Sequence, residues 1–189
     1  MKPTDRKTKI VTIAAKLFKE KGYSAVTMRD IAQAMDIKAA SLYNHIKSKQ
    51  EILVLIIIEI AEEFTTTMQQ ILDLEELTIK KIEKTIELHI DITLRNSDAL
   101  ACLNNDWMHL ANDPLAYFIK MREEYEENFR AIIKKGIADG EIKNLNVEVI
   151  IFSTLSTLRT LYLWYGRKKS PNAAVLRSNM TSVLLNGIV

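Results

Sequence analysis

Apolar residues recur three or four positions apart along most of the 189-residue chain, which is the spacing of one face of an α-helix. Ile79, Ile82, Ile86 and Ile90 show this pattern clearly. The chain holds only 5 glycines and 3 prolines, and this scarcity also favours helices. The pattern therefore predicts an all-α fold of about nine helices. We expect them at residues 5–21, 28–35, 39–46, 49–72, 78–96, 98–110, 114–137, 147–165 and 173–185.

One stretch is ambiguous by propensity. Residues 52–58 are seven consecutive apolar residues, most of them β-branched, and could form a strand. Ser48 and Glu51 precede this run with the spacing of a capping box, and the apolar residues after it keep helical spacing, so we expect a helix. Seven apolar residues fall far short of the ~20 that span a bilayer, and we therefore expect no membrane partner.

Residues 27–46 predict two short helices joined by a tight turn. Thr27 can cap the first helix, and the Asp30 carboxylate lies near the same positive helix end. Asp36 begins the turn and tolerates the left-handed backbone that such a turn can require. In the second helix, Leu42 and Ile46 point to one side and predict its buried face.

The opposite side of this second helix is small and polar. Ala40, Ser41 and Asn44 point outward, with Tyr43 and His45 on the two flanks. A helix this short must pack on its neighbour and leave that face outside. Small residues permit close approach to a DNA major groove, polar tips can reach base edges, and flanking groups can reach phosphates. The pattern therefore predicts a helix that reads duplex DNA.

Charge is distributed unevenly along the chain. The net charge is only +2, but residues 1–50 contain 11 Lys and Arg against 4 Asp and Glu, and the remainder contains 15 against 20. A basic head on an acidic body is typical of nucleic-acid binding. The single cysteine excludes an internal disulfide, and the polar, basic stretch at residues 1–9 shows no signal peptide. Both observations predict a cytoplasmic protein.

A specific motif runs through about the first 55 residues. Its members are Ala15, Leu17, Phe18, Gly22, Tyr23, Thr27, Ile31, Ala32, Leu42, Tyr43, Asn44, His45, Ile46, Ser48, Lys49, Glu51, Ile52 and Leu53. This set resembles the DNA-binding domain of the tetracycline-repressor (TetR) family. Two positions depart from the family pattern: Asp36 stands where the family usually has glycine, and Lys38 stands where it often has a serine cap.

The resemblance implies two domains and a regulatory function. We expect a three-helix DNA-binding domain at residues 1–48, with the helix-turn-helix at about 27–46, and a ligand-binding and dimerisation domain at residues 49–189. The implied function is a transcriptional repressor that a small, largely apolar ligand releases from a palindromic operator. Two alternatives stay open: a ligand-independent DNA-binding module acting through a partner protein, and a helical small-molecule-binding protein or enzyme with a vestigial head.

Residues of the DNA face are assigned partly from geometry and partly from the matching motif positions. The phosphate candidates are Thr27, Tyr43, Lys49 and His45, and the base-edge candidates are Arg29, Lys38, Ala40, Ser41 and Asn44, with Ala39 beginning the same helix. By donor and acceptor matching, Lys38 would favour guanine and Asn44 adenine. Alternatively, Tyr43 and His45 pack against the protein, and Lys38 and Arg29 are simply solvated.

The helix expected at residues 147–165 is apolar on nearly all sides, which is more buried surface than a body of this size can cover. A partner chain would resolve this, with the last two helices of two copies forming a four-helix bundle about a two-fold axis. The resemblance also implies a homodimer joined through the C-terminal helices. Two recognition helices would then meet the two halves of a palindromic operator.

The body is rich in aromatic residues, which fits ordinary packing or an apolar ligand pocket. The resemblance implies such a pocket. The lining candidates are His89, Asn105, Trp107, His109, Phe118, Arg122, Tyr125 and Phe152.

The sequence contains none of the common catalytic motifs. No nucleophile elbow, phosphate-binding loop or HExxH spacing occurs, so we expect neither an enzyme nor a cofactor. Asp106 and His109 are too few for a metal site, and Cys102 is expected in the core.

Overall fold

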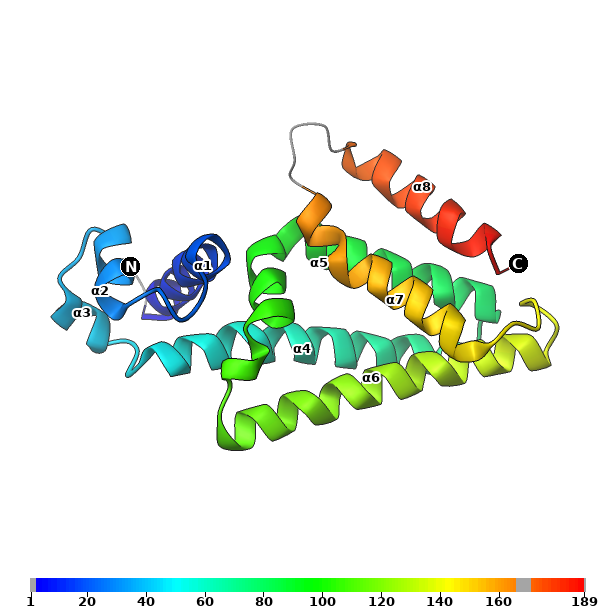
Figure 1. Ribbon diagram of the computed structural model, residues 1–189, viewed down its shortest axis with the longest axis horizontal. Coiled ribbons are helices and arrows are strands. Elements are labelled where there is room, and N and C mark those ends of the chain that lie inside the picture. The colour runs from blue at the N-terminus through cyan, green and yellow to red at the C-terminus, as the bar shows by residue number, and fades with distance from the viewer. Residues whose placement is uncertain (1–2, 166–170, 189) are drawn as a thin grey trace. The chain divides into compact units, whose positions relative to one another are not determined.

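The structure, a computed structural model, describes residues 3–165 and 171–188. Within these ranges it consists of α-helices and one 3-10 helix, without strands, which confirms the all-α prediction (Figure 1). The elements are α1 (Pro3–Lys21), α2 (Met28–Ala34), α3 (Ala39–Tyr43), α4 (Lys49–Asp73), α5 (Thr78–Asn105), η1 (Trp107–His109), α6 (Asn112–Ala138), α7 (Val147–Trp164) and α8 (Ala173–Asn186).

By packing, the chain divides into two compact units. Unit 1 comprises residues 1–61 and 96–119, and unit 2 comprises residues 62–95 and 120–189. Helices α4, α5 and α6 each continue from one unit into the other. This division describes packing, whereas the boundary expected between residues 48 and 49 separates functions and stays a prediction.

The helix-turn-helix lies in unit 1 and follows its sequence signals closely. The Thr27 hydroxyl accepts a hydrogen bond from the Asp30 amide at 3.2 Å, and the Asp30 carboxylate accepts one from the Thr27 amide at 2.7 Å. This capping box starts α2. Asp36 has a φ of 55°, so the turn does use the left-handed backbone. Leu42 and Ile46 are buried, as their spacing predicts.

Helix α3 is shorter than expected, because it ends at Tyr43 instead of Ile46. Its N-cap is Lys38, whose side chain makes no capping hydrogen bond. A five-residue helix without a cap has little stability of its own, and packing of the buried side chains holds it. Ile46 stays in the core, and its amide still donates to the Leu42 carbonyl at 3.2 Å.

Helix α4 confirms the choice of helix over strand for the β-branched run. The Ser48 hydroxyl accepts a hydrogen bond from the Glu51 amide at 3.1 Å. The Glu51 carboxylate accepts from the Lys47 amide at 2.8 Å, one residue before the position that a capping box normally uses. Both hydrogen bonds of the predicted capping box are therefore present, and the one that the Glu51 carboxylate accepts is shifted by one residue.

Helix α5 comprises two helical stretches that meet at a kink, as the two predicted helices require. The break expected near residue 97 is a kink at Asn96, whose φ of −136° and ψ of 41° are not helical. No glycine or proline occurs in residues 78–105, so the helical hydrogen bonds resume after the kink. The region expected to end the second helix forms η1 instead. Cys102 is fully buried, and its thiol donates to the Ala15 carbonyl at 3.7 Å, which confirms it as a core residue.

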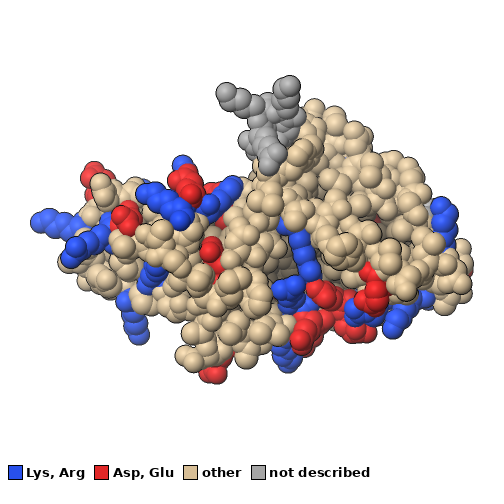
Figure 2. Space-filling model, viewed as in Figure 1, with Lys and Arg blue, Asp and Glu red and all other residues tan. Residues whose placement is uncertain are grey.

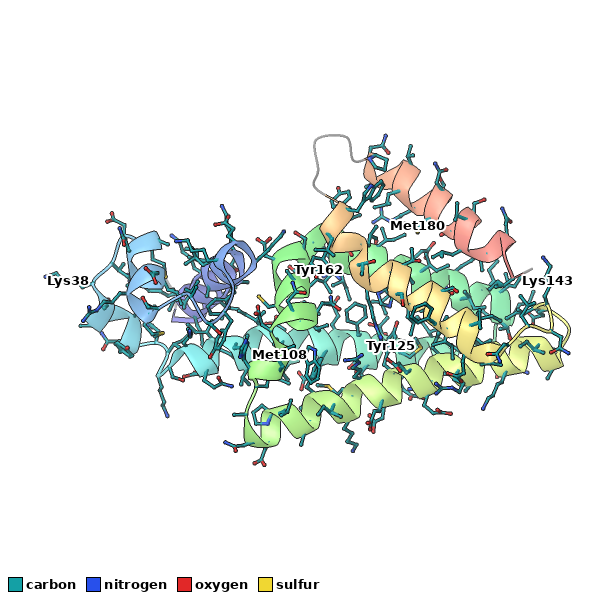
Figure 3. All side chains as sticks on the ribbon, viewed as in Figure 1. Lys38, Met108, Tyr125, Lys143, Tyr162 and Met180 are labelled. Atoms are coloured by element: carbon teal, nitrogen blue, oxygen red, sulfur yellow. The ribbon has the colours of Figure 1, made fainter. Side chains whose placement is uncertain are left out.

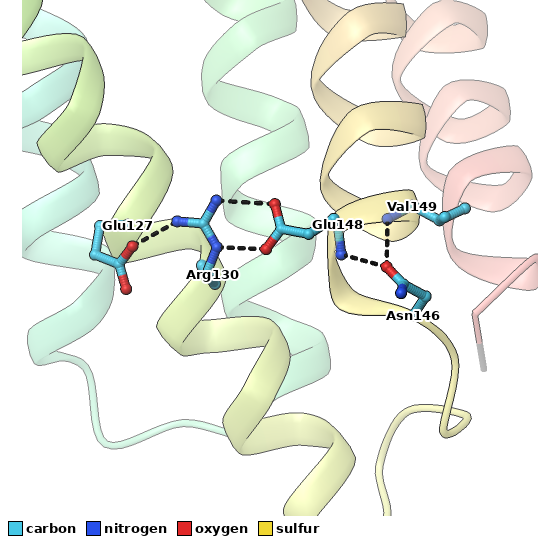
Figure 4. A network of polar contacts seen from close by, with 5 residues as sticks. All are labelled: Glu127, Arg130, Asn146, Glu148 and Val149. Atoms are coloured by element: carbon cyan, nitrogen blue, oxygen red, sulfur yellow. Dashed lines mark hydrogen bonds and ion pairs between the residues drawn. The ribbon is translucent and has the colours of Figure 1, made fainter.

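Unit 2 packs α7 and α8 with parts of α5 and α6. The Arg130 guanidinium of α6 donates to both Glu148 carboxylate oxygens of α7, at 2.7 and 3.0 Å, and also contacts Glu127 (Figure 4). Asn146 caps α7 by accepting hydrogen bonds from the Glu148 and Val149 amides. Exposed ion pairs contribute little free energy, so the buried apolar side chains of these helices supply most of the stability.

Gly136 marks a close approach inside unit 2. A Cβ atom at this position would lie 2.5 Å from the Ile142 Cδ1 atom and 2.6 Å from the Thr78 Cγ2 atom, and both side chains are buried. We expect Gly136→Ala to lower the free energy of unfolding by about 1–2 kcal/mol, although alanine favours helices. Urea unfolding measures this. Gly187→Ala is the control, because no atom lies within 4 Å of its added Cβ; equal losses in both variants would contradict the prediction.

Candidate nucleic-acid interface and interior polar site

The exposed face of α3 is small and polar. Ala40, Tyr43 and Asn44 are exposed, with 53 % of the Tyr43 surface accessible. Ala39, Ser41 and His45 are half-buried at the edges of this face. The opposite side is fully buried in unit 1. Neutral side chains of this size leave room for the edge of a duplex, while nearby hydroxyl, amide and imidazole groups can hydrogen-bond.

Cationic groups surround this face. Arg29 on α2 and Lys38 before α3 are exposed, and Figure 2 shows further Lys and Arg side chains over the surface of α1–α3. Lys38 extends from the tip of the turn (Figure 3). The Thr27 hydroxyl donates its proton to the Asp30 carboxylate at 2.6 Å, so a phosphate contact by this hydroxyl would replace that hydrogen bond.

Lys49 makes contacts inside unit 1 that its position in the sequence did not indicate. Its ammonium donates to the carbonyl oxygens of Tyr23 and Val26, both at 2.7 Å, and lies 4.2 Å from the centre of the Tyr23 ring. Two of its three N–H donors are thus used within unit 1, and one remains. Its role as a phosphate contact stays a prediction.

A buried polar pair lies inside unit 2. His89 Nε2 and the Tyr125 hydroxyl are 2.8 Å apart, and both residues are about 5 % exposed or less. The Phe64 ring lies 4.6 Å from the His89 ring and meets the Tyr125 ring edge-on. Figure 3 shows Tyr125 among the helices of this unit. Sequence reasoning did not include Phe64 in the site, although its apolar position on α4 was clear.

The apolar surroundings keep this pair uncharged. Burial, together with the smaller effect of the positive charge of Arg159, lowers the pKa of His89 to about 3. Burial also raises the pKa of Tyr125 above its ordinary value. The imidazole and the phenol are therefore both neutral near pH 7, and they offer a hydrogen-bond donor and an acceptor in an apolar interior.

The other predicted lining residues lie in different surroundings. In unit 1, the Phe118 ring is buried with its centre 5.8 Å from that of Trp107, whereas Asn105 and His109 are exposed. In unit 2, Arg122 is exposed, with its Nε atom 3.7 Å from Glu126. Phe152 is 72 % exposed on α7 and does not point into the interior. Among the described residues, no group of three or more metal-ligating side chains occurs.

Helices α7 and α8 carry large apolar side chains on their surface. On α7 these are Val149, Phe152, Leu163 and Trp164, and on α8 they are Val175 and Val183, with exposed fractions between 41 % and 72 %. A face of this composition on two adjacent helices is unusual for a surface in water. It belongs to the helices for which the sequence predicts a partner chain.

The fold and the α3 face together define a helix-turn-helix DNA-binding protein with a helical body. Residues 10–56 match the family model described as "Bacterial regulatory proteins, tetR family", and residues 75–188 match "Tetracyclin repressor-like, C-terminal domain". The second match alone spans more than half of the chain. The chain therefore belongs to the TetR family of transcriptional regulators, which confirms the resemblance seen in the motif.

Similar proteins align with nearly the whole chain. The chain is 25 % identical over 185 residues to the HTH-type transcriptional repressor KstR2 of Rhodococcus jostii (strain RHA1), which covers 97 % of this chain and 91 % of that protein. The structure of the ketosteroid transcriptional regulator KstR2 of Mycobacterium tuberculosis superposes with a TM-score of 0.90 at 20 % identity, over 97 % of this chain and 95 % of that chain. AibR in complex with isovaleryl coenzyme A and operator DNA gives 0.80 at 20 % identity, over 94 % and 97 %.

TetR-family regulators bind operator DNA and small-molecule ligands, and this chain is a transcriptional regulator of that family. In the described ranges, no helix combines the length and apolarity needed to cross a bilayer.

Proposed function

We propose that this repressor binds a palindromic operator as a homodimer in the cytoplasm and is released by a small, largely apolar ligand. The observation that carries the proposal is the exposed face of α3, whose opposite side is fully buried. Two copies of this face, related by a two-fold axis, would enter successive major grooves roughly 34–36 Å apart. The proposal assigns residues 1–48 to DNA binding and residues 49–189 to the ligand and the dimer, with no catalytic role.

On the DNA face we assign two kinds of contact. Residues on the flanks would meet phosphates, and residues at the tip of the turn and on the outer side of α3 would meet base edges. The phosphate set is Thr27, Tyr43, His45 and Lys49, and the base-edge set is Arg29, Lys38, Ala40, Ser41 and Asn44.

Lys38 supports the base-edge assignment most directly. It occupies the N-cap of α3 without capping it, and its positive charge lies at the positive end of the helix. A residue that is locally unfavourable at this position is expected where binding needs it. An exposed ammonium at the start of a recognition helix matches the N7 and O6 acceptors of guanine.

The dimer would form through α7 and α8. Between its exposed apolar side chains, α7 carries exposed threonines whose hydroxyls donate to its own backbone. Thr157 bonds the Ser153 carbonyl and Thr160 bonds the Ser156 carbonyl, both at 2.8 Å. Their polar protons are already satisfied, so covering these residues with a partner helix would leave no donor unpaired. This composition supports a four-helix interface between two copies.

The buried His89 and Tyr125 pair supports the choice of ligand. Two neutral polar groups beside Phe64 favour an apolar ligand carrying one uncharged hydrogen-bonding group, because an ionised group there would lose its hydration. The names of similar proteins mention a ketosteroid and isovaleryl coenzyme A, which both contain apolar parts.

Selection of bound duplexes from a random pool tests the proposal. The full-length chain is expected to select one motif of two inverted half-sites, and the absence of any motif would refute it. The Lys38→Ser variant, which restores a capping residue, is expected to lose a guanine preference in each half-site, worth about 1–3 kcal/mol. An unchanged motif would contradict the assignment of Lys38. Lys143→Ser, at an exposed position of unit 2, is the control.

A further inference from the structure

Tyr23, in the loop between α1 and α2, has contacts on several sides. It follows Gly22, whose φ of 82° ends α1. Its ring packs edge-on against Phe18 and lies 5.1 Å from the ring of His109 in η1. We call Tyr23, Lys49, Gln50, Asp106 and His109 the Tyr23 joint. All five residues lie in unit 1.

Gln50 connects two parts of this joint. Its Oε1 atom accepts a hydrogen bond from the Tyr23 hydroxyl at 2.9 Å, and its Nε2 atom donates to the His109 carbonyl at 3.0 Å. Burial raises the pKa of the Asp106 carboxyl above its ordinary value, and the nearby Tyr23 backbone opposes this shift. The segment around η1 is thus attached to Tyr23 through its hydroxyl and its ring.

The other side of Tyr23 is held by α4. The Lys49 ammonium bonds the carbonyls of Tyr23 and Val26, and the next residue, Thr27, caps α2. The short loop that sets the start of α2 is therefore fixed by η1 and by the first turn of α4. A shift of η1 by about one hydrogen-bond length would strain this loop or break the Gln50 bridge.

The η1 segment also occupies a special place in the chain, because it joins α5 to α6. Both helices continue into unit 2, where α5 carries His89 and α6 carries Tyr125. A ligand that displaces either helix would act on η1 through the chain itself.

We infer that the Tyr23 joint is the positioning element through which a displacement of η1 changes the placement of α2 and so the affinity for the operator. The inference rests on the proposed function. Coupling needs an element with two arrangements that both sites bias, and the Gln50 bridge, made or broken, is such an element.

The variants that test the joint are uncharged, so they leave the attraction to DNA phosphates unchanged. Gln50→Leu removes both hydrogen bonds of the bridge, and Tyr23→Phe removes only the hydroxyl. Gln69→Leu is the matched control, because Gln69 is on the same helix and donates to Asp73 one turn away.

For each variant we would measure affinity for the selected operator, affinity for unrelated DNA, and the melting temperature. Gln50→Leu is expected to weaken operator binding about 10-fold, with affinity for unrelated DNA within about twofold of wild type. Tyr23→Phe should lose less, and the double variant no more than Gln50→Leu, because one chain of contacts is broken. Gln69→Leu should bind as wild type does. The milder Tyr23→Phe keeps the test decisive if Gln50→Leu fails to fold.

Two results would overturn the inference while leaving the proposed function intact. One is wild-type operator affinity in both joint variants. The other is an equal loss of affinity for operator and unrelated DNA that follows the fall in melting temperature, as a purely structural role requires. A wild-type protein that selects no motif would instead refute the proposed function itself.

Discussion

Phe152→Glu is expected to separate the two copies of the repressor and abolish operator binding at concentrations where the wild type is saturated. Phe152 is 72 % exposed in the single chain and lies on the α7 face proposed for the dimer. Covering an unpaired carboxylate costs about 3 kcal/mol or more, which corresponds to a dimer dissociation constant raised more than 100-fold. Analytical ultracentrifugation measures the dissociation, and a DNA-binding titration measures its consequence.

Leu77→Glu is the control for this substitution. Leu77 is 65 % exposed, precedes α5, and is not on the α7 and α8 face. We expect it to stay dimeric and bind DNA as the wild type does. If Phe152→Glu remains a dimer, the assignment of this face is wrong. If both variants dissociate, added negative charge rather than a covered surface is responsible.

Acid should destabilise the wild-type protein through His89. Burial holds the pKa of His89 at about 3 in the folded chain, against 6.5 for an exposed imidazole. The unfolded chain therefore binds a proton as the pH falls through 6.5 while the folded chain does not, and stability is lost between about pH 6.5 and 3. From pH 7 to pH 5 this contribution is about 2 kcal/mol.

His89→Gln isolates the contribution, because glutamine hydrogen-bonds but does not titrate. Urea unfolding of both proteins at pH 7 and pH 5 gives four free energies. The wild type should lose about 2 kcal/mol more than the variant over this interval, whatever the absolute stability of the variant. Equal losses would show that His89 is accessible to protons in the folded state.

Most of the fold could be predicted from the local sequence. The capping pair of Thr27 and Asp30, the left-handed Asp36 and the helical α4 were all predicted correctly, because each depends on residues within a few positions. Helix ends were less certain. α3 ends at Tyr43, where the His45 amide bonds the Leu42 carbonyl three residues back, and α5 is kinked at Asn96 at the place where the sequence predicts a break.

The periodicity of the sequence does not predict which side chains contact each other across the fold. A helical pattern indicates which face of a helix is buried, but not which side chain meets it. His89 and Tyr125 were both expected inside, yet their hydrogen bond joins positions 36 residues apart. The Gln50 bridge to His109 spans 59 residues. Phe152 was assigned to the interior because apolar residues on α7 have two destinations, the core and the proposed partner, and spacing alone does not separate them.

The burial of Cys102 makes it possible to label each copy of the dimer at one chosen position. Burial raises the pKa of its thiol to about 12, so almost no reactive thiolate exists near neutral pH. Thiol-directed reagents should therefore ignore the native chain, whose sequence contains no other cysteine. A cysteine introduced at exposed Glu20 would then carry a spin label or dye as the sole attachment point in each copy. The distance between the two labels of a dimer would report directly how far apart its two DNA-binding domains lie, with and without a duplex.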